Sequence, residues 1–104
     1  MTVEVLYFEG CPSFDRLLPP LRLLVAEHGG DPAAIALRAV ETAEAAEADR
    51  FLGSPTVRVD GRDVEPTAAG RDDFGLKCRL YRSEEGQSPL PPEAWIRNAL
   101  AGRP

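Results

Sequence analysis

The hydrophobic positions near the start of the chain form a short run and then a helical pattern. The run VEVLYF (3–8) is β-branched and aromatic and stops at Gly10, so it predicts a buried strand. Across residues 13–28 apolar side chains recur every three or four positions, which predicts an amphipathic helix that ends at the glycines 29–30. Pro19 and Pro20 interrupt this pattern. Because a proline inside a helix loses a hydrogen bond, we expect a kink or local break there.

The middle of the chain predicts a strand, a helix and a hairpin. Apolar residues alternate in AIALRAV (34–40), which favours a second strand. The Ala- and Glu-rich stretch 41–52 favours a helix with Thr42 as its N-cap. In 55–65, Val57, Val59 and Val64 alternate with polar residues around an Asp-Gly pair at 60–61, which is a strong hairpin signal.

The last third is less regular. Residues 66–91 contain two loops around LKCRLYR (76–82), which fits either a strand or one helical turn. A helix is predicted over 92–100, with Trp95 among the residues that face the core. The predicted order is β-α-β-α-β-β-α in one domain, residues 1–104. Since a strand-helix-strand unit implies a parallel pair and a hairpin adds antiparallel strands, we expect an α/β fold: a mixed four-stranded sheet with helices on both faces.

Composition narrows the possible partners. The chain has 104 residues, 43% of them hydrophobic, and a net charge of −5 with no basic run. An acidic surface repels phosphate groups, so we expect no nucleic acid partner and no docking on anionic membranes. No apolar stretch approaches the roughly 20 residues that span a bilayer, and the N-terminus lacks the basic start of a signal peptide. We therefore expect a soluble cytoplasmic protein.

The two cysteines, Cys11 and Cys78, are the main candidates for chemistry. A structural disulfide is unusual in a reducing cytoplasm. With His28 as the only histidine, the chain also lacks the ligands of a four-coordinate zinc site, so we expect no metal or other cofactor. His28 itself is interpreted as a C-terminal cap of the first helix.

Cys11 lies where the first strand gives way to the first helix. A thiol at a helix N-terminus faces unpaired backbone N–H groups and the positive end of the helix dipole, which favour the thiolate. Pro12 suits the first helical position, and Gly10 keeps the bend open. The alternative is that Cys11 is a buried cysteine that only packs.

These features together resemble the thioredoxin superfamily. The element order is similar over nearly the whole chain apart from 66–91, Cys11 stands at the place of the family's nucleophile, and Pro19 stands where many members have a helix-kinking proline. GSPT (53–56) stands where the family places a cis-proline. The resemblance implies that the Ser54-Pro55 bond is cis and presents Ser54 as an edge for a substrate peptide or thiol. The alternative is an ordinary trans turn.

A narrower resemblance rests on the stretches YFEGCP, GSPTVRVDG and GLKCRLYR. They are similar to a group of small bacterial thioredoxin-like proteins, some of whose relatives are loosely labelled alkylmercury lyase-like. Lyase chemistry is not expected here, because nothing in the chain matches the fuller set of catalytic residues of those enzymes.

One departure from the family concerns the second thiol. A Cys-x-x-Cys motif would place cysteine at position 14, which is Phe14. Cys78 could replace it if the loop after the hairpin returns to the first helix, and the disulfide would then add about 4 kcal/mol of stability. Pairing requires Cα atoms within about 7 Å. The alternative is that Cys78 packs as an apolar residue. Arg79 or Arg82 could stabilise a thiolate.

Three functions fit these residues. The first is a thiol–disulfide oxidoreductase acting on a protein or small-thiol substrate, in which Cys11 attacks and Cys78 or an external thiol resolves. Pro12, Ser54 and Pro55 would border the site. The second is a soft-metal binder in which two thiolates hold Hg(II) or Cu(I). The third is a redox-inactive scaffold for protein contacts. The oligomeric state is open.

Overall fold

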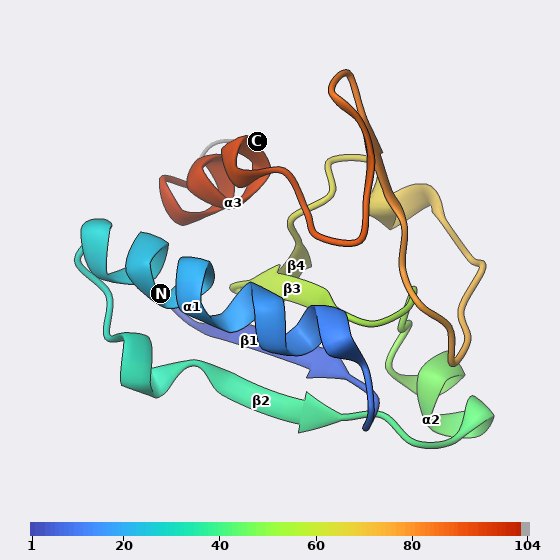
Figure 1. The fold of residues 1–104 in the computed structure, drawn as a ribbon. Helices are drawn as coiled ribbons and strands as arrows, with labels where there is room; N and C mark the ends of the chain where they lie inside the picture. The colour runs from blue at the N-terminus through green and yellow to red at the C-terminus, as the bar shows by residue number, and fades with distance from the viewer. Residues whose placement is uncertain (103–104) are drawn as a thin grey trace.

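A mixed four-stranded sheet lies at the centre of the protein in a computed structural model that describes residues 1–102 (Figure 1). Its strands are β1 (Val3–Tyr7), β2 (Ala36–Ala39), β3 (Thr56–Val59) and β4 (Arg62–Asp63). In space the order is β2-β1-β3-β4, with β1 parallel to β2 and antiparallel to β3, and β3 antiparallel to β4. The predicted α/β class and mixed four-stranded sheet are confirmed.

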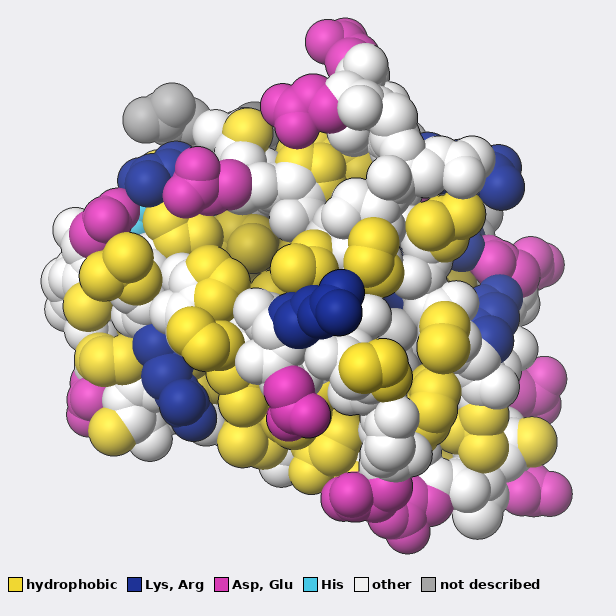
Figure 2. Space-filling model, in the orientation of Figure 1, with side chains coloured by type: hydrophobic (Ala, Val, Ile, Leu, Met, Phe, Trp, Pro, Cys, Tyr) yellow, Lys and Arg dark blue, Asp and Glu magenta, His cyan; other side chains and the backbone are white. Residues whose placement is uncertain are grey.

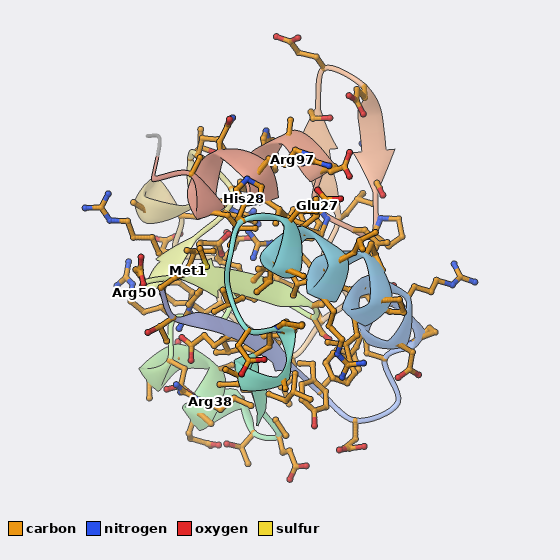
Figure 3. All side chains as sticks on the ribbon, turned by 90° about the vertical axis from the view of Figure 1, so that its left-hand side faces the viewer. Met1, Glu27, His28, Arg38, Arg50 and Arg97 are labelled. Atoms are coloured by element: carbon orange, nitrogen blue, oxygen red, sulfur yellow. The ribbon has the colours of Figure 1, made fainter. Side chains whose placement is uncertain are left out.

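Helices cover both faces of this sheet. α1 (Pro12–Glu27) and α3 (Glu93–Leu100) pack on one face, where the alternating valines of β1 and β3 meet leucines and isoleucine from the two helices. The Arg97 side chain of α3 reaches Glu27 of α1 at 3.1 Å, and the two helices lie side by side (Figure 3). α2 (Ala43–Ala48) packs on the other face, where a smaller core gathers around Leu6 and Phe51.

Helix α1 runs unbroken through Pro19 and Pro20, so the expected local break is wrong. The two prolines remove the hydrogen bonds that the carbonyls of Asp15 and Arg16 would otherwise accept. Both of those residues are exposed, so water can serve their carbonyls instead. His28 is the C-cap, as predicted, and its Nδ1 lies 2.9 Å from a carbonyl oxygen of the last turn.

The local signals in the middle of the chain are confirmed. Asp60 and Gly61 adopt φ values of 52° and 81° in the turn between β3 and β4, as a tight hairpin of this kind requires. Thr42 is the N-cap of α2, and its Oγ1 accepts a hydrogen bond from the Ala45 N–H at 3.0 Å. α2 is shorter than predicted, because the chain turns at Arg50 with φ 54°.

Residues 66–91 form a long excursion that the sequence pattern did not resolve. It contains one short 3₁₀ helix, η2 (Ala68–Gly70), and a separate two-stranded hairpin of β5 (Tyr81–Ser83) and β6 (Gly86–Ser88). Between η2 and β5 the chain descends along one side of the molecule to the neighbourhood of α2 and returns (Figure 1). Within this segment the Gly75 N–H donates to the Phe51 carbonyl at 3.0 Å.

The surface carries scattered apolar side chains. Large hydrophobic residues with substantial exposure are Met1, Leu23, Leu37, Leu76 and Leu80. On the face shown in Figure 2, charged side chains of both signs interrupt the apolar ones. None of the helices in residues 1–102 combines the length and the apolar character needed to cross a membrane.

Candidate functional site

Cys11 occupies the N-cap position of α1, and Pro12 is the first residue of that helix, as predicted. The Cys11 N–H donates to the Phe8 carbonyl at 3.3 Å, which closes a tight turn between β1 and α1. Gly10 allows this turn with φ 87°. The thiol makes no capping hydrogen bond to the helix, and Cys11 is only 5% exposed. The cysteine is therefore at the helix N-terminus but under the surface.

Phe14 occupies the position that a Cys-x-x-Cys motif would give to its second cysteine. Its ring stacks on that of Tyr7, with centroids 3.8 Å apart and planes within 5°. The pair joins α1 to the end of β1. Tyr7 is thus a packing residue, and position 14 provides an aromatic contact instead of a second thiol.

Ser54 and Pro55 lie directly beside this turn, and the peptide bond between them is cis, as the resemblance implies. The Phe8 N–H donates to Ser54 Oγ at 3.4 Å. Both Ser54 and Pro55 are almost completely buried. The serine hydroxyl therefore connects the start of β3 to the turn that leads into Cys11.

The backbone of Ser54 is paired with the segment around Cys78 in an isolated parallel β-bridge. The Ser54 N–H donates to the Lys77 carbonyl at 2.8 Å, and the Arg79 N–H donates to the Ser54 carbonyl at 2.9 Å. The expectation that Ser54 offers a free edge to a substrate peptide is thus wrong. The chain itself fills that edge, because the excursion after β4 folds back onto it.

Arg79 lies beneath this bridge in a buried ionic network. Its guanidinium donates to Asp63 at 2.7 and 3.1 Å and to Glu65 at 3.3 Å, and it lies 4.3 Å from the centre of the Tyr81 ring. Burial opposes the charge of Arg79, but Tyr81 and the two carboxylates outweigh it and leave the pKa raised. Carboxylates therefore balance the charge of Arg79.

The buried side chain of Tyr81 contacts both the residue before β3 and helix α3. Its hydroxyl donates to the Pro55 carbonyl, and its ring meets Trp95 edge-on at 6.3 Å. The side chain is buried, and burial raises the pKa of the phenol. Trp95 is a packing residue, as predicted, and Tyr81 packs against it and links β5 to the start of β3.

A pocket of about 470 Å³ opens beside Cys78. Its polar lining consists of Cys78 with four cationic side chains, two acidic ones and a threonine: Arg71, Lys77, Arg79, Arg82, Glu65, Asp73 and Thr67. Cys78 is exposed here, whereas Cys11 is buried, and both are free thiols. The cluster of cationic residues between 71 and 82 in an acidic chain was a signal of this pocket that the sequence reading missed.

The site matches no metal centre or protein of known function. Within residues 1–102, no three His, Cys, Asp or Glu side chains converge in a way that could hold a metal ion. A search of protein-family models, curated proteins and solved structures finds no match to this chain.

Proposed function

We propose that this chain is a thioredoxin-like thiol–disulfide redox protein whose Cys11 and Cys78 form a reversible disulfide. The observation that supports this most is that Ser54 contacts both segments of the chain that carry the cysteines. Its hydroxyl binds the turn that leads into Cys11, and its backbone pairs with the segment centred on Cys78. One buried serine thus binds the turn that precedes Cys11 and the segment that contains Cys78.

The direction of the side chains supports the pairing. Residues directly opposite each other in a β-bridge project their side chains to the same face. The Ser54 hydroxyl points toward Phe8, so the Cys78 side chain leaves the bridge on the side of the Phe8–Cys11 turn. The element order and the cis bond before β3 are the features on which the thioredoxin resemblance rests.

The reaction is a two-electron exchange. The two protein thiols give up two hydrogen atoms to a disulfide substrate, which leaves as two thiols, and the protein gains one internal S–S bond. A reducing thiol reverses the process. The substrate is a disulfide or thiol, and no metal or organic cofactor takes part.

Intact mass and thiol counting before and after mild oxidation test the proposal. We expect a monomer that loses two hydrogen atoms and both free thiols, and that regains them with a reductant. Cys11→Ser and Cys78→Ser are the matched controls, and neither should lose two hydrogen atoms within one chain. Two thiols that remain free, or that pair only between chains, would exclude the internal redox pair.

A further inference from the structure

The two thiols differ sharply in access to solvent. Cys78 is exposed, whereas Cys11 is 5% exposed and lies at the buried start of α1. A thiolate must approach a disulfide along the S–S axis, so the exposed sulfur meets an external disulfide first. We infer that Cys78, rather than Cys11, attacks the substrate, and that the pocket beside it selects small anionic disulfides. This inference rests on the proposed function.

The charge of the pocket favours an anionic substrate. Four cations and two acids line it, and Asp63 binds Arg79 from outside the lining, which leaves one net positive charge in a chain whose net charge is −5. Asp73 and Glu65 neutralise much of the positive charge of Arg71, and Asp73 also forms an ion pair with Lys77. Arg82 is exposed and has no ion pair or side-chain hydrogen bond to any part of residues 1–102. Its charge is available to a ligand.

A second observation concerns the Arg79 side chain, which also lines the pocket. It is 1% exposed, and its Nε has no hydrogen-bond partner within residues 1–102. A buried donor of this kind normally has water or a ligand oxygen as its acceptor. A water molecule bound beside the pocket would supply that acceptor and would in turn donate to a carboxylate of the ligand.

The geometry favours a small substrate over an extended peptide. A peptide that paired with Ser54 would need the backbone groups that already bind Lys77 and Arg79. The pocket volume of about 470 Å³ is in the range of sites that hold small molecules. A low-molecular-weight disulfide with carboxylate groups fits both conditions.

The chemistry proceeds in two balanced exchanges. The Cys78 thiolate attacks one sulfur of the substrate R–S–S–R, the S–S bond of the substrate breaks, and one R–S⁻ leaves and takes a proton from solvent. The Cys11 thiolate then attacks Cys78 Sγ and displaces the second R–S⁻. The products are two R–SH molecules and the Cys11–Cys78 disulfide.

Single-cysteine variants test which thiol attacks. With 3,3′-dithiodipropionate as the probe, Cys11→Ser should accumulate a mixed disulfide on Cys78, because the resolving thiol is gone. Cys78→Ser should react at least tenfold more slowly. Cys11→Ala is a second variant in case serine disturbs the buried site. The inference is overturned if Cys78→Ser captures the probe on Cys11 as fast as Cys11→Ser does on Cys78.

The charge preference has its own test in the Cys11→Ser background. Dithiodipropionate, bis(2-hydroxyethyl) disulfide and cystamine are similar in size and are anionic, neutral and cationic. Each rate is divided by the rate with a neutral model thiol. We expect the normalised rate to be highest for the anionic probe. Arg82→Gln should lower that rate about threefold. Arg22→Gln removes a charge on the exposed face of α1 and should leave the rate unchanged. Equal ratios for the three probes would overturn the anion selectivity.

These outcomes separate the inference from the proposed function. If the wild-type chain closes its internal disulfide but Cys11 captures the probe first, the redox function stands and the role given to Cys78 fails. If the internal disulfide never forms, the redox function fails, whichever thiol reacts with the probe.

Discussion

Ser54 and Cys78 lie opposite each other in a parallel β-bridge outside the main sheet. Two backbone hydrogen bonds of 2.8 and 2.9 Å hold the bridge together. It places the exposed thiol of the excursion next to the residue that contacts the Cys11 turn. Any substitution that separates the bridge should therefore change both the stability of the chain and the formation of the disulfide.

Gly53→Ala should open the bridge. Gly53 has φ 123°, and a Cβ there would lie 3.0 Å from the Lys77 carbonyl oxygen and from Arg79 Cβ. Backbone strain and steric overlap together should lower the free energy of unfolding by roughly 2–4 kcal/mol, measured in urea. Gly61→Ala has a positive φ but no atom near the added Cβ, so it should cost only about 1 kcal/mol. Equal losses would show that the contact with residues 77–79 is unimportant.

Arg79→Met should destabilise the fold strongly. The substitution removes the positive charge of a side chain that is 1% exposed. The carboxylates of Asp63 and Glu65, which are largely buried, then lose this cation as a partner. We expect a loss of roughly 3–5 kcal/mol in denaturant unfolding. Arg82→Met, at an exposed position, should change stability by less than about 0.5 kcal/mol. Recovery of part of the loss on adding Asp63→Asn would tie the effect to the uncompensated carboxylate.

Tyr81 should make the fold sensitive to alkaline pH. Burial raises the pKa of its phenol in the folded state, so the folded chain keeps the proton while the unfolded chain releases it above pH about 10. The free energy of unfolding should thus be unaffected below pH 10 and fall as the pH rises further. Tyr81→Phe loses the hydrogen bond to the Pro55 carbonyl and should cost about 1–2 kcal/mol at pH 7.

The alkaline part of that effect has a specific signature in urea unfolding under reducing conditions. The difference in free energy of unfolding between wild type and Tyr81→Phe should shrink above pH 10. Only the wild type has a phenol at position 81 that must keep its proton in the folded state. Tyr7→Phe leaves Tyr81 as the remaining tyrosine, and its phenolate absorbance should appear only together with unfolding. A phenolate signal in the folded chain would contradict the assignment.

The oxidised chain should be more stable than the reduced one. Cys11 and Cys78 are 67 positions apart, and a loop of that length gives about 4 kcal/mol through the reduced entropy of the unfolded state. The comparison is urea unfolding of the oxidised monomer with and without reductant. Cys78→Ser should show no dependence on reductant. A disulfide that lowered stability would indicate that the native backbone does not fit the bond.

Local sequence signals were enough to predict most of the fold. The β-branched run of β1, the Thr42 cap, the Asp60-Gly61 turn and the spacing of leucines in α1 act over a few residues. Each depends on a backbone preference or on the burial of one face, so neighbouring residues determine it. The predicted break at Pro19 and Pro20 failed because the exposure of the preceding turn, which only packing decides, removes the need for one.

The sequence by itself determined the order of the elements outside residues 66–91, the place of Cys11 at a helix start and the presence of a second cysteine. Tertiary structure decided the rest. It buried Cys11, exposed Cys78 and used residues 77–79 to fill the edge of Ser54. The reason is physical. The buried pairing of Arg79 with Asp63 and Glu65 joins segments far apart in the chain, and no local pattern in residues 66–91 specifies where such partners meet.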